Sequence, residues 1–281
     1  MVNFNGTLYD SSSNLLSIEN RGYAYGDALF ETLKVVHGKV LFWEDHYFRL
    51  MASMRIMRME IPMNFTMEFL ESEILKTIEA NQFSNATARV RINVHRVEGG
   101  KYRPNSNDIA YNMIAERLDA DFYSLSESPY VVELFKDFYV APGLLSTLKH
   151  NNKSINVLGS IFAKENDFDN CLLLNTEKTV VEALNGNLFL VKDRVIKTPP
   201  LSAGCLKGIM RKQLMELIEK LEGYTLEEAA ISPFELQKAD EIFISNVITG
   251  IQPITKYRKK EFKSEVSKLL LDKLNTKIRL S

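Results

Sequence analysis

The sequence predicts an α+β protein of two domains, and three observations support this fold class. The chain has 281 residues, of which 45% are hydrophobic, enough for one large core or two ordinary ones. Alternating and helically periodic segments interleave without a regular βαβ repeat, which favours α+β over a doubly wound sheet. A polar stretch over 119–129 is the best candidate linker. We therefore expect a small N-terminal α/β domain over 1–120 and a larger α+β domain over 121–281.

Local patterns predict the elements of the N-terminal domain. Leu29–Val36 and Lys39–Phe42 alternate around the turn at His37-Gly38, which is typical of a hairpin. The two following helices, over 44–59 and 66–80, have apolar residues at helical spacing, and Pro62 and Asn64 separate them. Two more strands are predicted over 88–95 and 109–115, with Gly99-Gly100 in the loop between them.

The same patterns continue into the C-terminal domain. Short apolar runs bounded by turn-forming residues predict strands, and longer amphipathic segments predict helices. The predicted strands are 130–135, 170–175, 187–191, 194–197 and 241–246, and the predicted helices are 154–166, 208–221 and 262–274.

Composition limits the class of partner. The 35 basic and 36 acidic side chains give a formal net charge of −1, so no surface field favours nucleic acid or an anionic membrane, and a small-molecule partner is expected. Cys171 and Cys205 lack the spacing of a metal knuckle or a disulfide framework, so we expect both to be reduced and predict no metal site. No basic-then-apolar leader and no long apolar run is present, which predicts a cytoplasmic protein.

Three chemically complementary pieces follow one another between Lys149 and Arg211. Lys153 is a candidate amine nucleophile, Glu182 is a carboxylate where a strand meets a turn, and Gly208 opens a helix whose free amides could receive a phosphate. Pyridoxal 5'-phosphate (PLP) needs all three, because an amine forms the Schiff base, an acid keeps the pyridine nitrogen protonated and a cup holds the phosphate. Taken singly, each is more often a solvated lysine, a turn-capping glutamate or an ordinary helix start. Lys149, four residues before Lys153, is a rival amine.

His46 and Arg49 are three residues apart on the first predicted helix and so share a face. An arginine binds phosphate bidentately, and a neighbouring histidine can orient it. A structural histidine beside a surface arginine is the alternative interpretation.

With these pieces in place, the sequence resembles the class IV aminotransferases, which are the fold-type IV PLP enzymes. This family includes branched-chain aminotransferase, D-amino acid aminotransferase and aminodeoxychorismate lyase. The resemblance spans nearly the whole chain and rests on several motifs in the right order. These are the early segment Asn20–Glu31, the His-x-x-Arg-Leu segment in Asp45–Leu50, the signature Val181–Phe189 and the signature Lys207–Arg211.

The resemblance implies a role for each candidate residue. Lys153 becomes the Schiff-base lysine, because Lys153-Ser154-Ile155-Asn156 is similar to the family's Lys-x-x-Asn at a helix start, whereas no helix is expected directly after Asn152 of the Lys149 motif. The implied cofactor is PLP, between the two domains of a homodimer in which the neighbouring subunit helps to build each site. Its implied ligands are Arg49, Glu182, Gly208, Ile209, Met210 and Thr249.

Departures from the family patterns guide the choice of subfamily. Phe30 stands where the D-amino acid enzymes have Tyr, and the loop Gly99-Gly100-Lys101-Tyr102-Arg103 lacks their Arg-x-His, so D-amino acids are disfavoured. The Gly-Gly-basic loop and the short chain resemble the lyase, whereas Glu31 resembles the transaminases. We expect 4-amino-4-deoxychorismate lyase, which releases pyruvate and 4-aminobenzoate.

Two other functions remain open. The first is a branched-chain type transaminase that uses a 2-oxo acid, and the second is a non-catalytic scaffold, which the joint presence of the lysine, the acid and the phosphate cup disfavours. In both the lyase and the transaminase, the predicted substrate-binding residues are Phe30, Lys101 and Arg103. Arg91 is a further cationic candidate for binding a substrate carboxylate.

Overall fold

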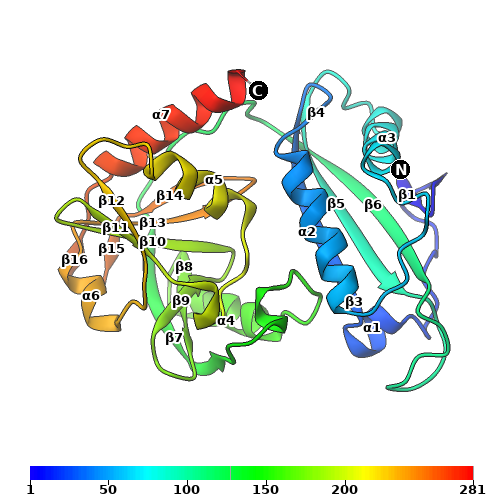
Figure 1. Cartoon of the computed structure of the whole chain (residues 1–281), viewed down its shortest axis with the longest axis horizontal. Coiled ribbons are helices and arrows are strands. Elements are labelled where there is room, and N and C mark those ends of the chain that lie inside the picture. The colour runs from blue at the N-terminus through cyan, green and yellow to red at the C-terminus, as the bar shows by residue number, and fades with distance from the viewer. Residues whose placement is uncertain (127, 281) are drawn as a thin grey trace. The chain divides into compact units, whose positions relative to one another are not determined.

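The computed structural model describes residues 1–126 and 128–280 and interleaves helices with strands (Figure 1). The fold class predicted from the sequence, α+β, is confirmed. Contacts between residues divide the chain into two compact units, Met1–Asp121 with Lys149–Asn152, and Phe122–Leu148 with Lys153–Ser281. The return of four residues to the first unit has a local cause. Phe30 N donates to Lys149 O at 2.8 Å and Asn151 N donates to Ala28 O at 3.0 Å, so this segment lies along strand β3.

The first unit is built on a six-stranded antiparallel sheet. Its order is β2-β1-β6-β5-β3-β4. The strands are β1 (Val2–Phe4), β2 (Thr7–Tyr9), β3 (Ala28–Val36), β4 (Lys39–Val40), β5 (Thr87–Arg96) and β6 (Ile109–Leu118), and the helices are α1 (Arg21–Tyr25), α2 (Trp43–Ile56) and α3 (Met67–Ala80).

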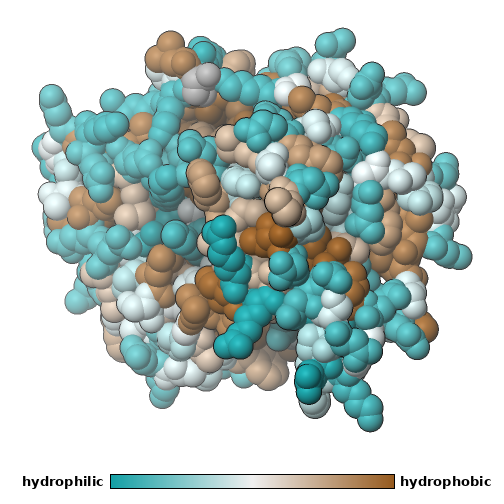
Figure 2. Space-filling model, turned by 45° about the vertical axis from the view of Figure 1, so that its right-hand side comes forward, coloured by the Kyte–Doolittle hydropathy of each residue, from teal (hydrophilic) through white to brown (hydrophobic). Residues whose placement is uncertain are grey.

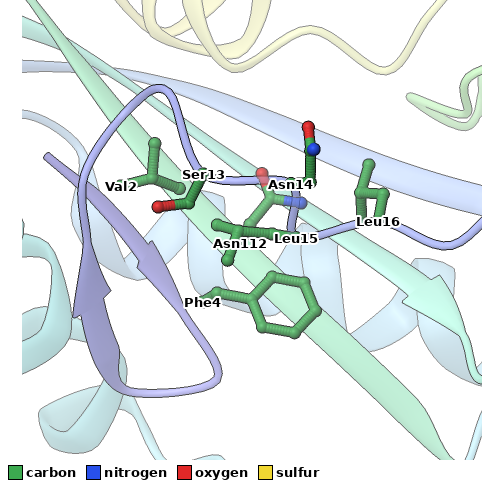
Figure 3. Close-up of a pocket in the computed structure, with 7 residues that line it drawn as sticks. All are labelled: Val2, Phe4, Ser13, Asn14, Leu15, Leu16 and Asn112. Atoms are coloured by element: carbon green, nitrogen blue, oxygen red, sulfur yellow. The ribbon is translucent and has the colours of Figure 1, made fainter.

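Helices α2 and α3 pack on one face of this sheet. The cross-strand row Glu31, Ile92, Met113 and Asn3 points to that face, because Glu31 bonds to His46 of α2 and Asn3 bonds to Glu73 of α3. The neighbouring row, Phe30, Asn93, Asn112 and Phe4, therefore points to the opposite face, since successive strand residues alternate. A groove of about 320 Å³ lies there, between that face and the loop 13–16 (Figure 3). It is lined by Val2, Phe4, Ser13, Asn14, Leu15, Leu16 and Asn112.

The second unit is built on a ten-stranded sheet. Its main path is β12-β11-β10-β9-β8-β7-β15-β16, and β13 joins it by pairing with β10 and β14. The strands are β7 (Val131–Val140), β8 (Asn170–Asn175), β9 (Val180–Ala183), β10 (Gly186–Lys192), β11 (Val195–Thr198), β12 (Thr225–Glu228), β13 (Glu241–Asn246), β14 (Gly250–Ile254), β15 (Lys256–Tyr257) and β16 (Lys260–Glu261). The helices are α4 (Ser154–Glu165), α5 (Ile209–Ile218), α6 (Pro233–Lys238) and α7 (Glu265–Leu280).

The core of the second unit lies on both sides of the central strands. Every residue of β8 is buried, and alternate residues join different clusters: Leu172 and Leu174 pack with β10 and β13, whereas Cys171 and Leu173 pack with Phe135 and α4. The rings of Phe189 and Phe243 stack at 5.0 Å. A short apolar strand such as β8 is expected to be buried on both faces. Strand β8 pairs with β9, which carries Glu182, so this core fixes the position of β9.

Several predicted boundaries differ from the observed ones: the strand predicted over 130–135 continues to Val140, and the helices predicted over 44–59 and 208–221 end at Ile56 and Ile218. Two further differences have physical reasons. The strand predicted over 39–42 ends at Val40, because Phe42 adopts a left-handed φ of 55° from which α2 starts. The last helix begins at Glu265 rather than Phe262, because the carboxylate of the distant Glu241 accepts from Val266 N at 2.8 Å and from Ser267 N at 2.7 Å. The predicted linker over 119–129 includes Glu127, which lies outside the described residues.

Neither cysteine forms a disulfide, and both are buried. In the two described ranges, no helix has the length and apolarity to cross a membrane. The same ranges contain no group of three or more His, Cys, Asp or Glu that could hold a metal ion. The face drawn in Figure 2 is mostly hydrophilic, with an apolar patch near its centre.

Candidate active site

Lys153 is the N-cap residue of α4 in the second unit. It cannot cap the helix with its own side chain, and its half-buried amine extends instead into a region close enough to Glu182 for the two charges to interact. Burial lowers the pKa of the Lys153 amine, although the Glu182 carboxylate opposes this shift. A larger fraction of the amine is therefore neutral, and only the neutral form is a nucleophile.

Asn156, one turn into α4, ties this helix to the strand that carries Glu182. Its side-chain Nδ2 donates to Leu184 O at 2.7 Å, two residues beyond Glu182. Gly159, on the following turn, lies so close to Leu184 that an added Cβ would collide with that side chain. The start of α4 and the end of β9 are therefore held against each other by a hydrogen bond and by close packing.

The loop before α5 is bonded to the same acid. Glu182 Oε2 accepts from Leu206 N at 2.9 Å, and Leu206 O accepts from Asn187 Nδ2 at 2.9 Å. Both polar groups of Leu206 are thus fixed by side chains from β9 and β10. A Cβ at Gly208 would collide with Asn187 Oδ1, so residue 208 must be glycine for the loop to lie this close.

Helix α5 begins directly after Gly208, which has no side chain to cap it. The side chains of Ile209 and Met210 are buried in the core, so only their backbone amides are available at this helix start. These amides and the helix dipole favour an anion.

Thr249 lies in the turn between β13 and β14. Asn246 Oδ1 accepts from Ile248 N and Thr249 N at 3.0 and 2.9 Å, which shapes this turn. The turn follows Ser245, whose register partner is Asn187 of β10, and Asn187 is bonded to the loop before α5, so Thr249 and that loop are at the same end of these strands. Tyr123 also holds this turn, because its hydroxyl donates to Val247 O at 2.6 Å.

Arg49 lies in the first unit and is held by Glu31. Its Nε donates to Glu31 Oε1 at 2.7 Å, and Glu31 Oε2 is 2.7 Å from His46 Nδ1. All three side chains are buried. Burial opposes the charge on Glu31, but Arg49 and His46 outweigh it and lower the Glu31 pKa to about 2. Burial lowers the pKa of His46, which is therefore neutral at pH 7.

Phe30 lies between two cations of the first unit. The guanidinium carbon of Arg91 is 4.2 Å from the ring centroid, and Lys149 Nζ is 4.3 Å from it. Lys149 also lies close enough to His46 to lower its pKa. The two lysines are therefore placed differently, since Lys149 is beside Phe30 and the Arg49 cluster whereas Lys153 is beside Glu182.

The helix predicted to start at Ser154 does start there, with Lys153 as its N-cap, so Asn152 precedes the helix and is not directly followed by it, as expected. Only the Lys153 motif therefore has its asparagine, Asn156, inside the helix. Lys101 and Arg103 are exposed in the loop between β5 and β6. Sequence reasoning gave no role to Asn187, Leu206 or Tyr123, because their contacts arise from strand register and from residues far along the chain.

A family model of class IV aminotransferases matches residues 28–257. The chain belongs to the class IV aminotransferase family. The resemblance inferred from the motifs is thus confirmed, and since the family and the relatives below are PLP-dependent aminotransferases and lyases, the chain is an enzyme.

Its relatives have more than one activity. Aminodeoxychorismate lyase of Vibrio harveyi is 26% identical over 84% of this chain and 85% of its own length. A putative branched-chain-amino-acid aminotransferase of Methanocaldococcus jannaschii is 28% identical over 90% and 86%. D-alanine aminotransferase of Listeria monocytogenes is 28% identical over 89% and 85%.

Solved structures of class IV enzymes have the same fold. The 4-amino-4-deoxychorismate lyase of Pseudomonas aeruginosa superposes with a TM-score of 0.81 at 26% identity, over 98% of each chain. The branched-chain aminotransferase of Thermoproteus uzoniensis, solved with norvaline, has a TM-score of 0.85 at 23% identity, over 97% of this chain and 92% of that one. The second likeness supports the fold alone.

The residues of the second unit fit a pyridoxal phosphate. They provide an amine of lowered pKa, a carboxylate fixed by a backbone amide, and a helix start that no side chain caps. These are the three functions that a PLP enzyme needs from its protein.

Proposed function

We propose that this class IV enzyme binds PLP through Lys153 and acts as a 4-amino-4-deoxychorismate lyase. One observation carries the cofactor part of the proposal: Glu182 is near the Lys153 amine and also accepts the Leu206 amide of the loop before α5. The acid is thus bonded to the loop before α5 and lies within electrostatic reach of the amine. Isolated surface residues would have no reason to share such contacts.

Each residue has a proposed task. Glu182 would bind the pyridine nitrogen, and the amides that follow Gly208 would bind the phosphate, with Thr249 contributing from its turn. Arg49 is proposed as a phosphate ligand on the resemblance alone, and Glu31 would hold its guanidinium in one orientation. Once bound, PLP supplies an electron sink for charge that develops beside the substrate amine.

Lys153 would also move the proton. Its amine is tethered by four methylenes, so it can leave the cofactor and return to the carbon that bears the substrate amine. The pKa of this amine is lowered by burial, which favours its acting as a base near neutral pH. The substrate then separates into pyruvate and 4-aminobenzoate, and no second substrate is needed.

Lys149 is the second candidate for this amine. It is favoured by its contact with Phe30, a predicted substrate residue, and by its position near His46. Lys153→Ala, Lys149→Ala and the control Lys164→Ala, an exposed residue on the last turn of α4, separate the two. We expect the visible absorbance band of bound PLP to disappear only in Lys153→Ala. Loss of the band only in Lys149→Ala would instead assign the attachment of PLP to Lys149.

The Gly-Gly-basic loop and the short chain support the lyase over a transaminase, whereas relatives of both activities match most of this chain. The wild-type enzyme should release pyruvate and 4-aminobenzoate from 4-amino-4-deoxychorismate without a 2-oxo acid. Formation of glutamate from leucine and 2-oxoglutarate would instead select the branched-chain transaminase. Transfer from D-alanine would show that the argument from Phe30 is wrong, and a colourless protein that takes up no PLP would exclude all three.

The proposal includes a homodimer. It is supported by exposed apolar side chains of the second unit, in α4 and in the segment before it, because contact of apolar side chains with water is unfavourable. These are Leu144, Leu145, Val157, Leu158 and Ile161. Light scattering should give twice the 32.2 kDa chain mass, and a monomer at micromolar concentration would contradict the proposal.

A further inference from the structure

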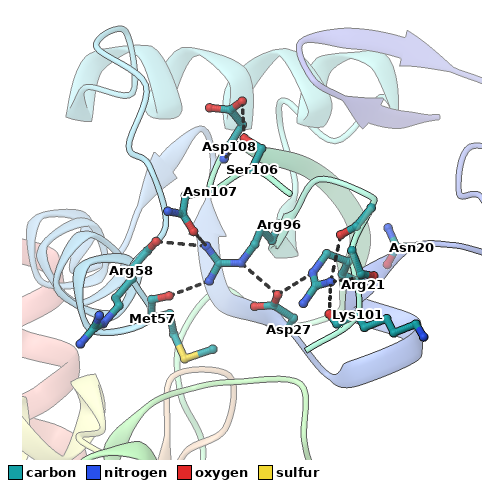
Figure 4. A network of polar contacts seen from close by, with 12 residues as sticks. Asn20, Arg21, Asp27, Met57, Arg58, Arg96, Lys101, Ser106, Asn107 and Asp108 are labelled. Carbon is teal, nitrogen blue, oxygen red and sulfur yellow. Dashed lines mark hydrogen bonds and ion pairs between the residues drawn. The ribbon is translucent and has the colours of Figure 1, made fainter. Parts of the chain in front are cut away.

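Arg21, at the start of α1, is buried and bonds to the loop between β5 and β6 (Figure 4). Its Nη1 donates to three successive carbonyls, Gly99 O at 3.1 Å, Gly100 O at 3.4 Å and Lys101 O at 2.7 Å. Its Nε donates to Asp27 Oδ2 at 3.0 Å. The backbone of the loop therefore curls around one guanidinium.

The far end of the same loop is held by a second buried arginine. Arg96 Nε donates to the same Asp27 oxygen at 3.0 Å, and its Nη1 donates to Asn107 Oδ1 at 2.7 Å. Arg96 also donates to Met57 O and Arg58 O at the end of α2. One carboxylate thus connects two arginines that fix the two ends of the loop (Figure 4).

The tip of the loop is turned tightly and points outward. Gly99 and Gly100 have φ of 104° and 77°, and a Cβ at Gly100 would collide with Arg103 O. Lys101, Tyr102 and Arg103 are all exposed. The Tyr102 ring contacts Tyr25 at 5.8 Å, and the Arg21 guanidinium lies 4.9 Å from the same Tyr25 ring.

An exposed tip with no buried side chain has little packing of its own to order it. Desolvating a guanidinium is unfavourable unless its partners are well placed, so a buried arginine used on backbone carbonyls indicates a geometry that must be kept. We propose that Arg21 is a positioning residue that fixes Lys101 and Arg103 for recognition of a substrate carboxylate remote from the reacting amine. This inference rests on the proposed function, in which Lys101 and Arg103 bind substrate.

The fork of Arg21 explains why lysine would not suffice. Nε and Nη1 donate to Asp27 and to the loop at the same time, whereas a lysine ammonium is a single point of donation on a flexible stem. Arg21→Lys should therefore keep the positive charge but no longer hold the loop 99–103 in its position.

Hydrogen exchange tests the order of the loop without reference to activity. Arg21→Gln and Arg21→Lys are compared with Arg89→Gln, which removes a cation of the same sheet whose partner, Glu116, is on β6 rather than in the loop. Both Arg21 variants should exchange the amides of 99–103 about tenfold faster than wild type, the effect of losing one charged hydrogen bond. Unchanged exchange in folded Arg21→Gln would overturn the proposal.

Kinetics test the effect on substrate, with whichever substrate the assays above identify. Arg21→Gln should raise KM about tenfold while kcat and the PLP absorbance band stay within about twofold of wild type. In a Lys101→Ala/Arg103→Ala background the same change should have no further effect on KM, since the residues through which Arg21 acts are absent. An equal additional effect in that background would show a general structural role and overturn the proposal. A wild-type protein that binds no PLP would refute the proposed function, and the exchange experiment alone would then decide whether Arg21 positions the loop.

Discussion

Asn156 Nδ2 donates to Leu184 O at 2.7 Å, and this bond links the helix that begins beside Lys153 to the strand that carries Glu182. Nothing in the local sequence around either residue indicates the other, since 28 positions separate them. The bond gives the asparagine of the Lys-x-x-Asn motif a physical task, which is to keep an amine and an acid at a constant separation.

Replacing Asn156 with alanine should therefore affect cofactor binding more than stability. We expect about 1 kcal/mol less stability in urea unfolding, the ordinary effect of one side-chain hydrogen bond, and about tenfold weaker PLP binding in absorbance titration. The matched control is Asn166→Ala at the other end of α4, where Nδ2 donates to Phe162 O at 2.8 Å. If both variants bind PLP equally, Asn156 has no special role.

Glycine at 208 is required by space rather than by backbone conformation. Its φ is −71°, which any residue adopts, but a Cβ would displace the Asn187 amide and break its bond to Leu206 O. Gly208→Ala should cost about 1–3 kcal/mol of stability and weaken PLP or inorganic phosphate binding at least about tenfold. Gly143→Ala, where a Cβ meets no atom within 4 Å, is the control. Wild-type phosphate affinity in Gly208→Ala would remove this loop from the site.

Short strands that are buried on both faces could be predicted well from the sequence. The run Glu241–Asn246 was predicted with its observed ends, because both its faces are buried and a turn bounds it. The edges of the fold could not be predicted in the same way. Strands β15 and β16 have two residues each, too few for a period to be visible, and the start of α7 depends on the distant Glu241.

The candidate site shows the same division. Lys153, Glu182 and Gly208 could be proposed because their motifs are local, and their roles stay predictions. Asn187 could not be proposed, because its contact with Leu206 depends on the register of β10 and on the path of a loop 19 residues away. The preference for Lys153 over Lys149 rested on the predicted helix start, and α4 does start at Ser154, with Asn156 inside it and Asn152 before it; the role of the lysine stays a prediction.

The polar segment predicted as a linker contains an anchor for the second unit. Tyr123 is buried, and an added Cβ at Gly250 would approach its ring to 2.7 Å. Tyr123→Phe should lower stability by about 1–2 kcal/mol, because Val247 O loses its partner in a buried position. It should also weaken PLP binding if the Thr249 turn contacts the cofactor. The exposed Tyr23→Phe is the control, and equal stability of the two variants would contradict the anchoring role.

His46 should make the stability of the enzyme depend on pH between 7 and 5. Burial lowers its pKa in the folded state, whereas the unfolded chain has the ordinary value of 6.5. The folded state therefore binds fewer protons, so the stabilising contribution is present above pH 6.5 and is lost as the pH falls below it. The neighbouring Glu31, with a pKa of about 2, stays ionised throughout and does not confuse the measurement.

His46→Asn keeps a donor for Glu31 and removes the titrating ring. Between pH 7 and pH 5, wild type should lose up to about 2 kcal/mol more than this variant in urea unfolding, a limit set by the unfolded pKa alone. The other three histidines contribute equally to both proteins and cancel in the difference. Parallel pH profiles would mean that His46 accepts a proton in the folded state as readily as in water. In that case His46 would be a cation at pH values below 6.5, and there Glu31 could not serve Arg49 alone as its counter-ion at the proposed phosphate site.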